Sequence, residues 1–267
     1  MEQIPAISTP LRPMAWNVLA RQTIDANVNI VQGDFMDSSV NLASLVDGVI
    51  RSRRSIRAFL PREISRDVLN EILAVASRAP SGANVQPWKV HVLTGESLRK
   101  LSSALLAVHN APDGPAVEPR EFDYYPSQWV EPYIGRRRKV GFDLYRVLGI
   151  ARGEQDRMHA QAGHNYAFFG APVGMIFTID RILGQGSWLD YGLFLQNVMI
   201  CARARGLDTC PQAAFIEYHN TVSQTLDLAA NEMLVCGMSL GYADPDAASN
   251  RLETEREPVS AFTTFHD

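Results

Sequence analysis

Apolar residues in the first part of the chain recur at the spacing of an α-helix. Five of them share one helical face because they lie at i, i+3, i+4, i+7 and i+8: Leu42, Leu45, Val46, Val49 and Ile50. A second helix is predicted to begin at Ser65, whose side chain suits an N-cap, and to end before Pro80. A third helix is expected over about residues 96–109.

Shorter apolar segments predict strands over residues 88–93, 172–179 and 233–238. Residues 187–205 predict a long helix that is apolar on most sides, ends at Gly206, and is therefore buried in a core or between subunits. A further helix is expected near residues 216–228, and the tail after residue 245 shows no helical period. Helices outnumber strands without a strict βαβ repeat, so the predicted fold class is α+β, a sheet covered by helices.

Two segments interrupt this pattern. Residues 1–41 contain too little apolar content for a core of their own and are predicted to be an N-terminal arm or leader. The domain then covers residues 42–267. Within it, residues 110–163 are rich in proline, glycine, tyrosine and arginine, and we expect a long irregular insertion that acts as a lid.

Composition excludes several classes of protein. The chain has 267 residues with a net charge of -4, which argues against non-specific nucleic-acid binding. No charge-free stretch is long enough to span a bilayer, so no membrane partner is expected. The three cysteines form no CxxC pair and the first residues lack a signal-peptide pattern, so we expect a cytoplasmic protein. His159 and His164 are five positions apart and do not share a helix face, so no metal site is expected.

Four short segments carry groups suited to an anion or a polar ring. Residues 53–57 (RRSIR) offer bidentate guanidinium donors and a hydroxyl. Residues 79–88 (APSGANVQPW) combine a glycine with polar side chains. Residues 210–215 (CPQAAF) precede a predicted helix and leave backbone N–H groups open, and Arg256 lies in the tail. Taken one at a time, each segment is more typical of an ordinary turn than of a ligand site.

In this order and at these spacings, the four segments resemble the FMN-dependent nitroreductase family over about residues 43–266. The most specific match is the loop at residues 79–88. Residues 53–59 (RRSIRAF) resemble the opening phosphate-and-ribityl motif, and residues 237–242 (GMSLGY) the last strand and turn. The resemblance implies a nitroreductase-like fold: a central, mostly antiparallel sheet flanked by helices, in a domain-swapped homodimer with FMN at the interface.

The same resemblance implies which residues bind FMN. Arg53, Ser55, Arg57 and Arg256 would hold the phosphate, and Arg54 would lie near the pyrimidine edge of the ring, where positive charge tunes the flavin. The partner chain would supply Pro80, Ser81, Gly82 and Asn84 along the ring, supported by Gln86. Backbone N–H groups near Gln212, Ala213 and Ala214 would lie close to flavin N5.

The implied chemistry is a two-step exchange. NADH or NADPH gives a hydride to the flavin and leaves, and a nitroaromatic compound takes its place and is reduced to the hydroxylamine in a ping-pong mechanism. No catalytic side chain is required. The expected substrate contacts are the Ala83 N–H and an aromatic lid that includes Tyr124, Tyr125, Trp129 and Tyr133. An arginine of residues 136–138, with Arg136 as the named candidate, is expected to pair with a substrate carboxylate.

Three alternatives remain open from the sequence. The first is reductive dehalogenation of a halophenol, since iodotyrosine deiodinases share the RRSxR and APSGA motifs. The second is a quinone or flavin reductase. The third is a flavin-binding regulator without enzymatic activity, although the sequence shows no DNA-reading helix and no basic face.

Overall fold

The computed structural model describes residues 41–112 and 119–266. The chain divides into two compact units, Met1–Gly48 and Val49–Asp267, and helix α2 (Leu42–Ser52) crosses the division. The arm expected over residues 1–41 lies outside the described residues except for its last position. The expected domain start at residue 42 therefore stays a prediction.

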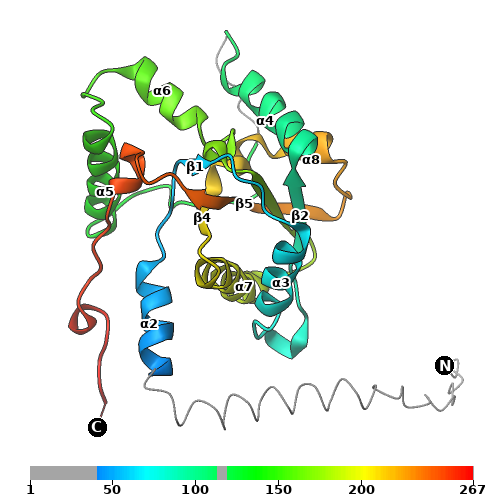
Figure 1. Ribbon diagram of the computed structural model, residues 1–267, viewed down its shortest axis with the longest axis vertical. Coiled ribbons are helices and arrows are strands. Elements are labelled where there is room, and N and C mark those ends of the chain that lie inside the picture. The colour runs from blue at the N-terminus through cyan, green and yellow to red at the C-terminus, as the bar shows by residue number, and fades with distance from the viewer. Residues whose placement is uncertain (1–40, 113–118, 267) are drawn as a thin grey trace, which may run out of the picture. The chain divides into compact units, whose positions relative to one another are not determined.

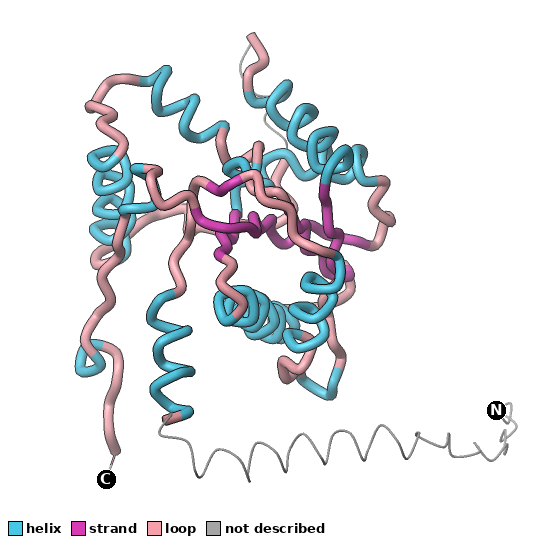
Figure 2. Tube along the Cα trace, in the orientation of Figure 1, coloured by secondary structure: helices cyan, strands magenta, loops and turns pink. Residues whose placement is uncertain are grey.

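A five-stranded sheet forms the centre of the second unit (Figures 1 and 2). The strands are β1 (Phe59–Leu60), β2 (Lys89–Thr94), β3 (Val173–Asp180), β4 (Asp208–Gln212) and β5 (Glu232–Ala243). Their order is β1-β5-β3-β2, β4 also pairs with β5, and each of these pairings is antiparallel. The mostly antiparallel sheet with flanking helices confirms the predicted fold class.

Helices cover both faces of this sheet. On one face lie α3 (Arg66–Ala76) and α7 (Gln185–Ala204), whose core includes Ile72, Phe177 and Phe194. On the other lie α4 (Gly95–His109), α8 (His219–Leu226) and the 3-10 turns η3 (Phe168–Gly170) and η4 (Ala213–Tyr218). Figure 1 shows α3 and α7 below the strands and α4 and α8 above them. Burial of apolar side chains on both faces is the main source of stability.

Several predicted boundaries are confirmed. The side chain of Ser65 caps α3 by accepting a hydrogen bond from the Val68 N–H at 3.4 Å. Strands β2 and β3 lie within one residue of the expected ranges. Helix α7 ends at Ala204, and Gly206 adopts the positive φ of +72° that favours glycine after a helix.

The prediction of an irregular insertion is wrong in part, because residues 110–163 contain two helices. They are α5 (Tyr133–Val147) and α6 (Gln155–Gly163). No residue of α5 is buried, so the helix shows no apolar period in the sequence. Exposed ion pairs stabilise it instead, including Lys139 with Asp143 at 2.7 Å one turn apart.

The strand predictions miss β1 and β4 and end β5 too early. Strand β4 contains Asp208 and Pro211, which are depleted in strands. The expected strand at residues 233–238 extends to Ala243, and every second residue of the extension, beginning at Ser239, is small. Gly241 shows one reason: a Cβ there would lie 2.8 Å from the Pro172 ring and 3.0 Å from the Phe59 ring.

One helix prediction needs correction. The helix expected from residue 216 begins at His219, because η4 precedes it. In the single chain α7 is only partly buried, since Leu189 is 72% exposed and Leu193 is 42% exposed, and its expected burial between subunits stays a prediction. The tail contains two short 3-10 turns, η5 (Ala248–Arg251) and η6 (Val259–Ala261). In the described part of the chain, no helix has the length and hydropathy needed to cross a membrane.

Candidate functional site

The arginine segment between α2 and β1 lies against strand β4. Ser55 forms an isolated parallel bridge with Thr209, and the Ile56 N–H donates to the Thr209 carbonyl at 3.1 Å. Burial raises the pKa of the neighbouring Cys210 to about 11, and the positive charges of Arg57 and Arg53 partly oppose that shift. These two guanidinium groups therefore lie close enough to the buried thiol to affect it.

Asn250 in η5 ties the C-terminal tail to this segment. Its Oδ1 accepts a hydrogen bond from the Arg57 N–H at 2.8 Å, and its Nδ2 donates to the carbonyls of Ala58 and Asp244 at 2.8 and 2.9 Å. Arg54 Nη1 donates to the Asn250 carbonyl at 3.2 Å. Sequence reasoning missed Asn250, because one asparagine in a polar tail gives no periodic or motif signal.

The tail brings Arg256 close to Arg53. The pKa of Arg53 is lowered, first by burial and then by the positive charge of Arg256. Arg256 Nη1 donates to the Thr254 hydroxyl at 2.9 Å and to the Glu255 carbonyl at 2.8 Å. Among the described residues, neither guanidinium forms an ion pair with a carboxylate. An anion beside the two guanidinium groups would offset their mutual repulsion, so the donor set suits a phosphate group.

Helix α5 holds the tail on either side of Arg256. Arg136 Nη2 pairs with Glu257 Oε1 at 2.9 Å, and Lys139 Nζ lies 3.5 Å from Glu255 Oε1. A cavity of about 410 Å³ between α5 and the tail includes all five residues. The acidic neighbours of Arg256 therefore pair with α5 and leave Arg256 available to another anion.

The loop at residues 79–88 has an unusual backbone. Ala83, Asn84 and Gln86 have φ values of +50°, +57° and +50°, a region that residues other than glycine rarely adopt. The Gln86 N–H donates to Ser81 Oγ at 3.0 Å, and its side chain donates to the Asn84 carbonyl at 3.2 Å. The 3-10 turn η2 (Gly82–Asn84) and Pro80 are exposed. The predicted loop is thus an ordered structure at the surface.

The single chain does not join this loop to the arginine segment. Within residues 41–112 and 119–266, no hydrogen bond or ion pair connects the two sets. The assignment of the loop to the partner chain's flavin therefore stays a prediction.

At the end of β4, the side chain of Gln212 is fully engaged. Ser239 Oγ donates to its Oε1 at 2.6 Å, and its Nε2 donates to the Asn165 carbonyl at 2.8 Å. No side chain caps η4, which begins at Ala213, so the N–H groups of Ala213 and Ala214 have no intrahelical acceptor. The expectation that these N–H groups lie close to flavin N5 stays a prediction.

A second cavity brings part of the insertion to this point. It has a volume of about 530 Å³, and its lining includes Tyr124, Trp188, Gln212 and Ala213. Burial raises the pKa of the Tyr124 phenol above its ordinary value, and the neighbouring Tyr125 adds to this shift. The structure thus places one predicted lid residue beside two predicted flavin-binding residues.

An aromatic row continues from Tyr124 to helix α5. Tyr124 and Tyr125 have ring centroids 4.7 Å apart, and Tyr125 and Trp129 lie 5.5 Å apart. The Arg137 guanidinium lies 4.8 Å from the Trp129 ring and 5.7 Å from the Tyr125 ring. The aromatic row therefore lies beside the positive charge of Arg137, whereas Arg136 is the named candidate for the substrate carboxylate.

The remaining predicted lid residues lie apart from this row. Tyr133 is 58% exposed, and Arg136 lies over its ring at 5.8 Å while pairing with Glu257. The charge of Arg136 is therefore already balanced. The expectation that Arg136 pairs with a substrate carboxylate stays a prediction. Arg137 is better placed for this role, because it lies over the aromatic row.

Comparison with known proteins decides the family. The family model described as the Nitroreductase family matches residues 50–242. The chain belongs to the nitroreductase family. It is 45% identical over 219 residues to a 4-nitrobenzoate reductase of Pseudomonas putida, a match that covers 82% of this chain and 94% of the relative. It is 39% identical to a chloronitrobenzene nitroreductase of Comamonas testosteroni, covering 82% and 96% of the two chains.

A solved structure supports the same assignment. The crystal structure of the FMN-dependent nitroreductase NfnB from Mycobacterium smegmatis in complex with NADPH has a TM-score of 0.80 and 32% identity, covering 85% of this chain and all of that one. The predicted resemblance of the chain to the nitroreductase family is therefore confirmed.

Proposed function

We propose that this nitroreductase binds FMN and uses NAD(P)H to reduce an aromatic nitro group to the hydroxylamine. The observation that carries the proposal is the approach of Arg53 and Arg256, two cations without carboxylate partners among the described residues. Similarity to a 4-nitrobenzoate reductase and to an FMN-dependent nitroreductase solved with NADPH supports the cofactor and the substrate class.

In this proposal the two ends of the domain share the phosphate. An FMN phosphate carries nearly two negative charges, which the guanidinium groups of Arg53, Arg57 and Arg256 offset while Ser55 donates a hydrogen bond. Arg54, held by the Asn250 carbonyl, contributes positive charge toward the ring. Because Asn250 bonds to both segments, it keeps these donors together.

FMN bound at this site would supply the hydride chemistry between NAD(P)H and the nitro group, and the two substrates would occupy the site in turn. For one nitro group, two NAD(P)H and two protons give one hydroxylamine, one water and two NAD(P)⁺. The residues of the chain itself bind and orient the substrates, and they exclude water from the site. The N–H groups at the start of η4 provide donors, and the rings of Tyr124, Tyr125 and Trp129 provide a stacking surface for an aromatic substrate.

We further propose a homodimer in which the loop at residues 79–88 serves the partner's flavin. In the single chain the apolar stripe of α2 is exposed, with Leu45 at 51%, and α7 exposes Leu189 at 72%. Exposed apolar stripes of this kind are typical of an interface. We expect the enzyme to work in the cytoplasm, where Cys201, Cys210 and Cys236 stay reduced.

Anaerobic stopped-flow spectroscopy tests this function. The purified enzyme is reduced with one equivalent of NADPH or NADH and mixed with 4-nitrobenzoate, nitrobenzene, a quinone or a halophenol. We expect a yellow protein that NAD(P)H bleaches and that the nitroarenes reoxidise fastest. A colourless protein after reconstitution with FMN contradicts the proposal, and preferential reoxidation by quinone or halophenol assigns one of the alternative activities.

A further inference from the structure

Helix α7 forms a hydrogen bond to the loop at residues 79–88 next to Ala83, the first loop residue with a positive φ value. The Asp190 carboxylate, through Oδ2, accepts a hydrogen bond from the Gly82 N–H at 3.1 Å. In the described part of the chain, this is the one side-chain hydrogen bond to η2 from outside the loop. A carboxylate that accepts from a backbone N–H forms a charge-assisted bond, which is stronger than a neutral one.

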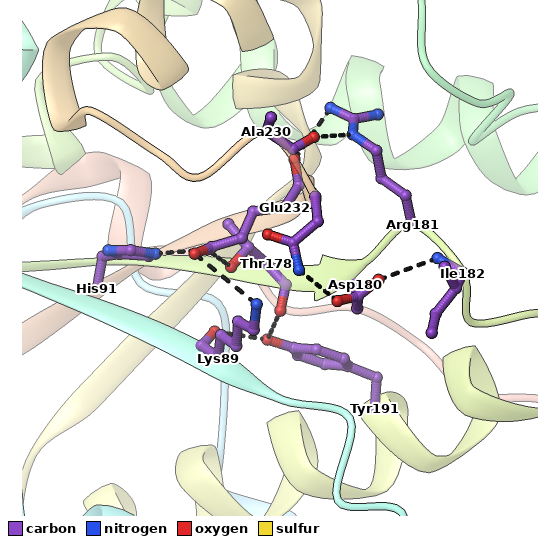
Figure 3. Close-up of polar contacts among 10 residues, drawn as sticks. Lys89, His91, Thr178, Asp180, Arg181, Ile182, Tyr191, Ala230 and Glu232 are labelled. Atoms are coloured by element: carbon purple, nitrogen blue, oxygen red, sulfur yellow. Dashed lines mark hydrogen bonds and ion pairs between the residues drawn. The ribbon is translucent and has the colours of Figure 1, made fainter.

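The same helix also fixes the far end of the loop. One turn after Asp190, the ring of Phe194 stacks on Trp88 with centroids 4.7 Å apart and an interplanar angle of 7°. The Tyr191 hydroxyl lies 2.8 Å from the Lys89 carbonyl and 3.0 Å from the Thr178 carbonyl, as Figure 3 shows. Both ends of the loop are therefore fixed by neighbouring positions of one helix.

Figure 3 also shows why the Lys89 end is rigid. Glu232 accepts hydrogen bonds from His91 Nε2 at 2.9 Å and from the Thr178 hydroxyl, and Lys89 Nζ lies 3.9 Å from it. This cluster joins β2, β3 and β5, so Lys89 has little freedom to move. Among the residues that the structure describes, the Gly82 end has no comparable cluster, and its side-chain hydrogen bond from outside the loop is the one to Asp190.

The turn that Asp190 holds is the part of the loop with unfavourable backbone angles. Ala83 and Asn84, which follow Gly82, both have positive φ values and relax to ordinary angles unless the surroundings prevent it. Bonds within the loop connect Ser81, Asn84 and Gln86 with one another, but they do not attach the turn to the fold.

We propose that Asp190 is a positioning residue that sets the Gly82–Asn84 turn before flavin binds. The proposal rests on the proposed function in one respect, that this loop contacts FMN. A turn that is already ordered binds its ligand more tightly, because the ordering cost is met by the fold rather than by the binding step. Asp190 thereby acts on the flavin through the turn without touching it.

Asp190→Ala tests the proposal with two independent measurements. Amide hydrogen exchange of the flavin-free protein reports the loop, and FMN titration with a midpoint-potential measurement reports the cofactor. We expect exchange at Gly82 and Ala83 to become at least about tenfold faster, the FMN Kd to rise about tenfold, and the potential to shift. Asp190→Asn keeps an acceptor oxygen, so it should show smaller changes in all three. Asp67→Ala, which removes an exposed charge on α3, is the matched control and should change none of them.

Each outcome decides the proposal. Unchanged exchange in Asp190→Ala overturns it, and so does faster exchange with FMN Kd and potential within twofold of the parent. If Asp190→Ala fails to fold, Asp190→Asn provides the same comparison. If the parent protein binds no FMN, the proposed function fails, while exchange in the flavin-free variants still decides whether Asp190 holds the turn.

Discussion

The Asn250 side chain accepts a hydrogen bond from the Arg57 N–H at 2.8 Å, although the two residues lie 193 positions apart. The same side-chain amide donates to the Ala58 carbonyl, so one asparagine in the tail is hydrogen-bonded to the backbone of two consecutive residues. The bond joins the tail that contains Arg256 to the segment that contains Arg53, and the positive charge of Arg256 lowers the pKa of Arg53.

Removing both cations should abolish tight cofactor binding. We expect Arg53→Ala combined with Arg256→Ala to raise the FMN Kd about a hundredfold or more, since each charge-assisted bond contributes about 1.5–3 kcal/mol. Fluorescence titration of the flavin measures it. Arg138 is an exposed arginine on α5, and Arg138→Ala controls for the loss of one positive charge. If the double variant binds FMN as tightly as the parent, the two arginines do not form the phosphate site.

Asn250→Ala should weaken both the fold and the site. The substitution leaves buried backbone groups without partners and should lower the free energy of unfolding by about 2–3 kcal/mol. The FMN affinity should fall as well, because Arg256 loses its anchor. Urea unfolding and flavin titration measure the two effects, with the exposed Asn70→Ala on α3 as a control. Normal stability in Asn250→Ala would show that the tail is held elsewhere.

Substrate charge should distinguish Arg136 from Arg137. Arg137 stacks on Trp129 with no carboxylate partner among the described residues, whereas Arg136 is paired with Glu257. We expect Arg137→Ala to raise the KM for 4-nitrobenzoate about tenfold and to leave the KM for uncharged nitrobenzene unchanged. Arg136→Ala should change the KM for 4-nitrobenzoate and the KM for nitrobenzene only slightly. The reverse result would restore Arg136 as the carboxylate-binding residue.

Stability at alkaline pH should depend on Cys210. Burial raises its pKa to about 11, and an unfolded thiol has a pKa of about 8.5. The folded state therefore binds the proton more tightly, so this contribution is fully present below about pH 8.5 and is lost as the pH rises toward 11. In Cys210→Ala, the loss of unfolding free energy between pH 8 and 10.5 should be smaller than in the parent by about 2 kcal/mol. Urea titrations at the two pH values measure it. An equal loss in both proteins would show that the thiol is not buried in solution.

The sequence by itself determined the elements with strong local patterns. Ser65 and the apolar period after it define α3, and Gly206 marks the end of α7, because caps and helical periodicity act over a few residues. The segments around Arg53, Gly82 and Gln212 could also be recognised, and they lie within the residues that match the family model.

Tertiary structure decided how those segments meet. Strand β4 depends on its pairing with β5, and α5 depends on exposed ion pairs, so neither of these two elements carries an apolar pattern. The bonds of Asn250 and Asp190 join residues more than a hundred positions apart. Such contacts are specified by packing of the whole domain rather than by any local signal, which is why the chain's motifs were predictable and the residues that hold them were not.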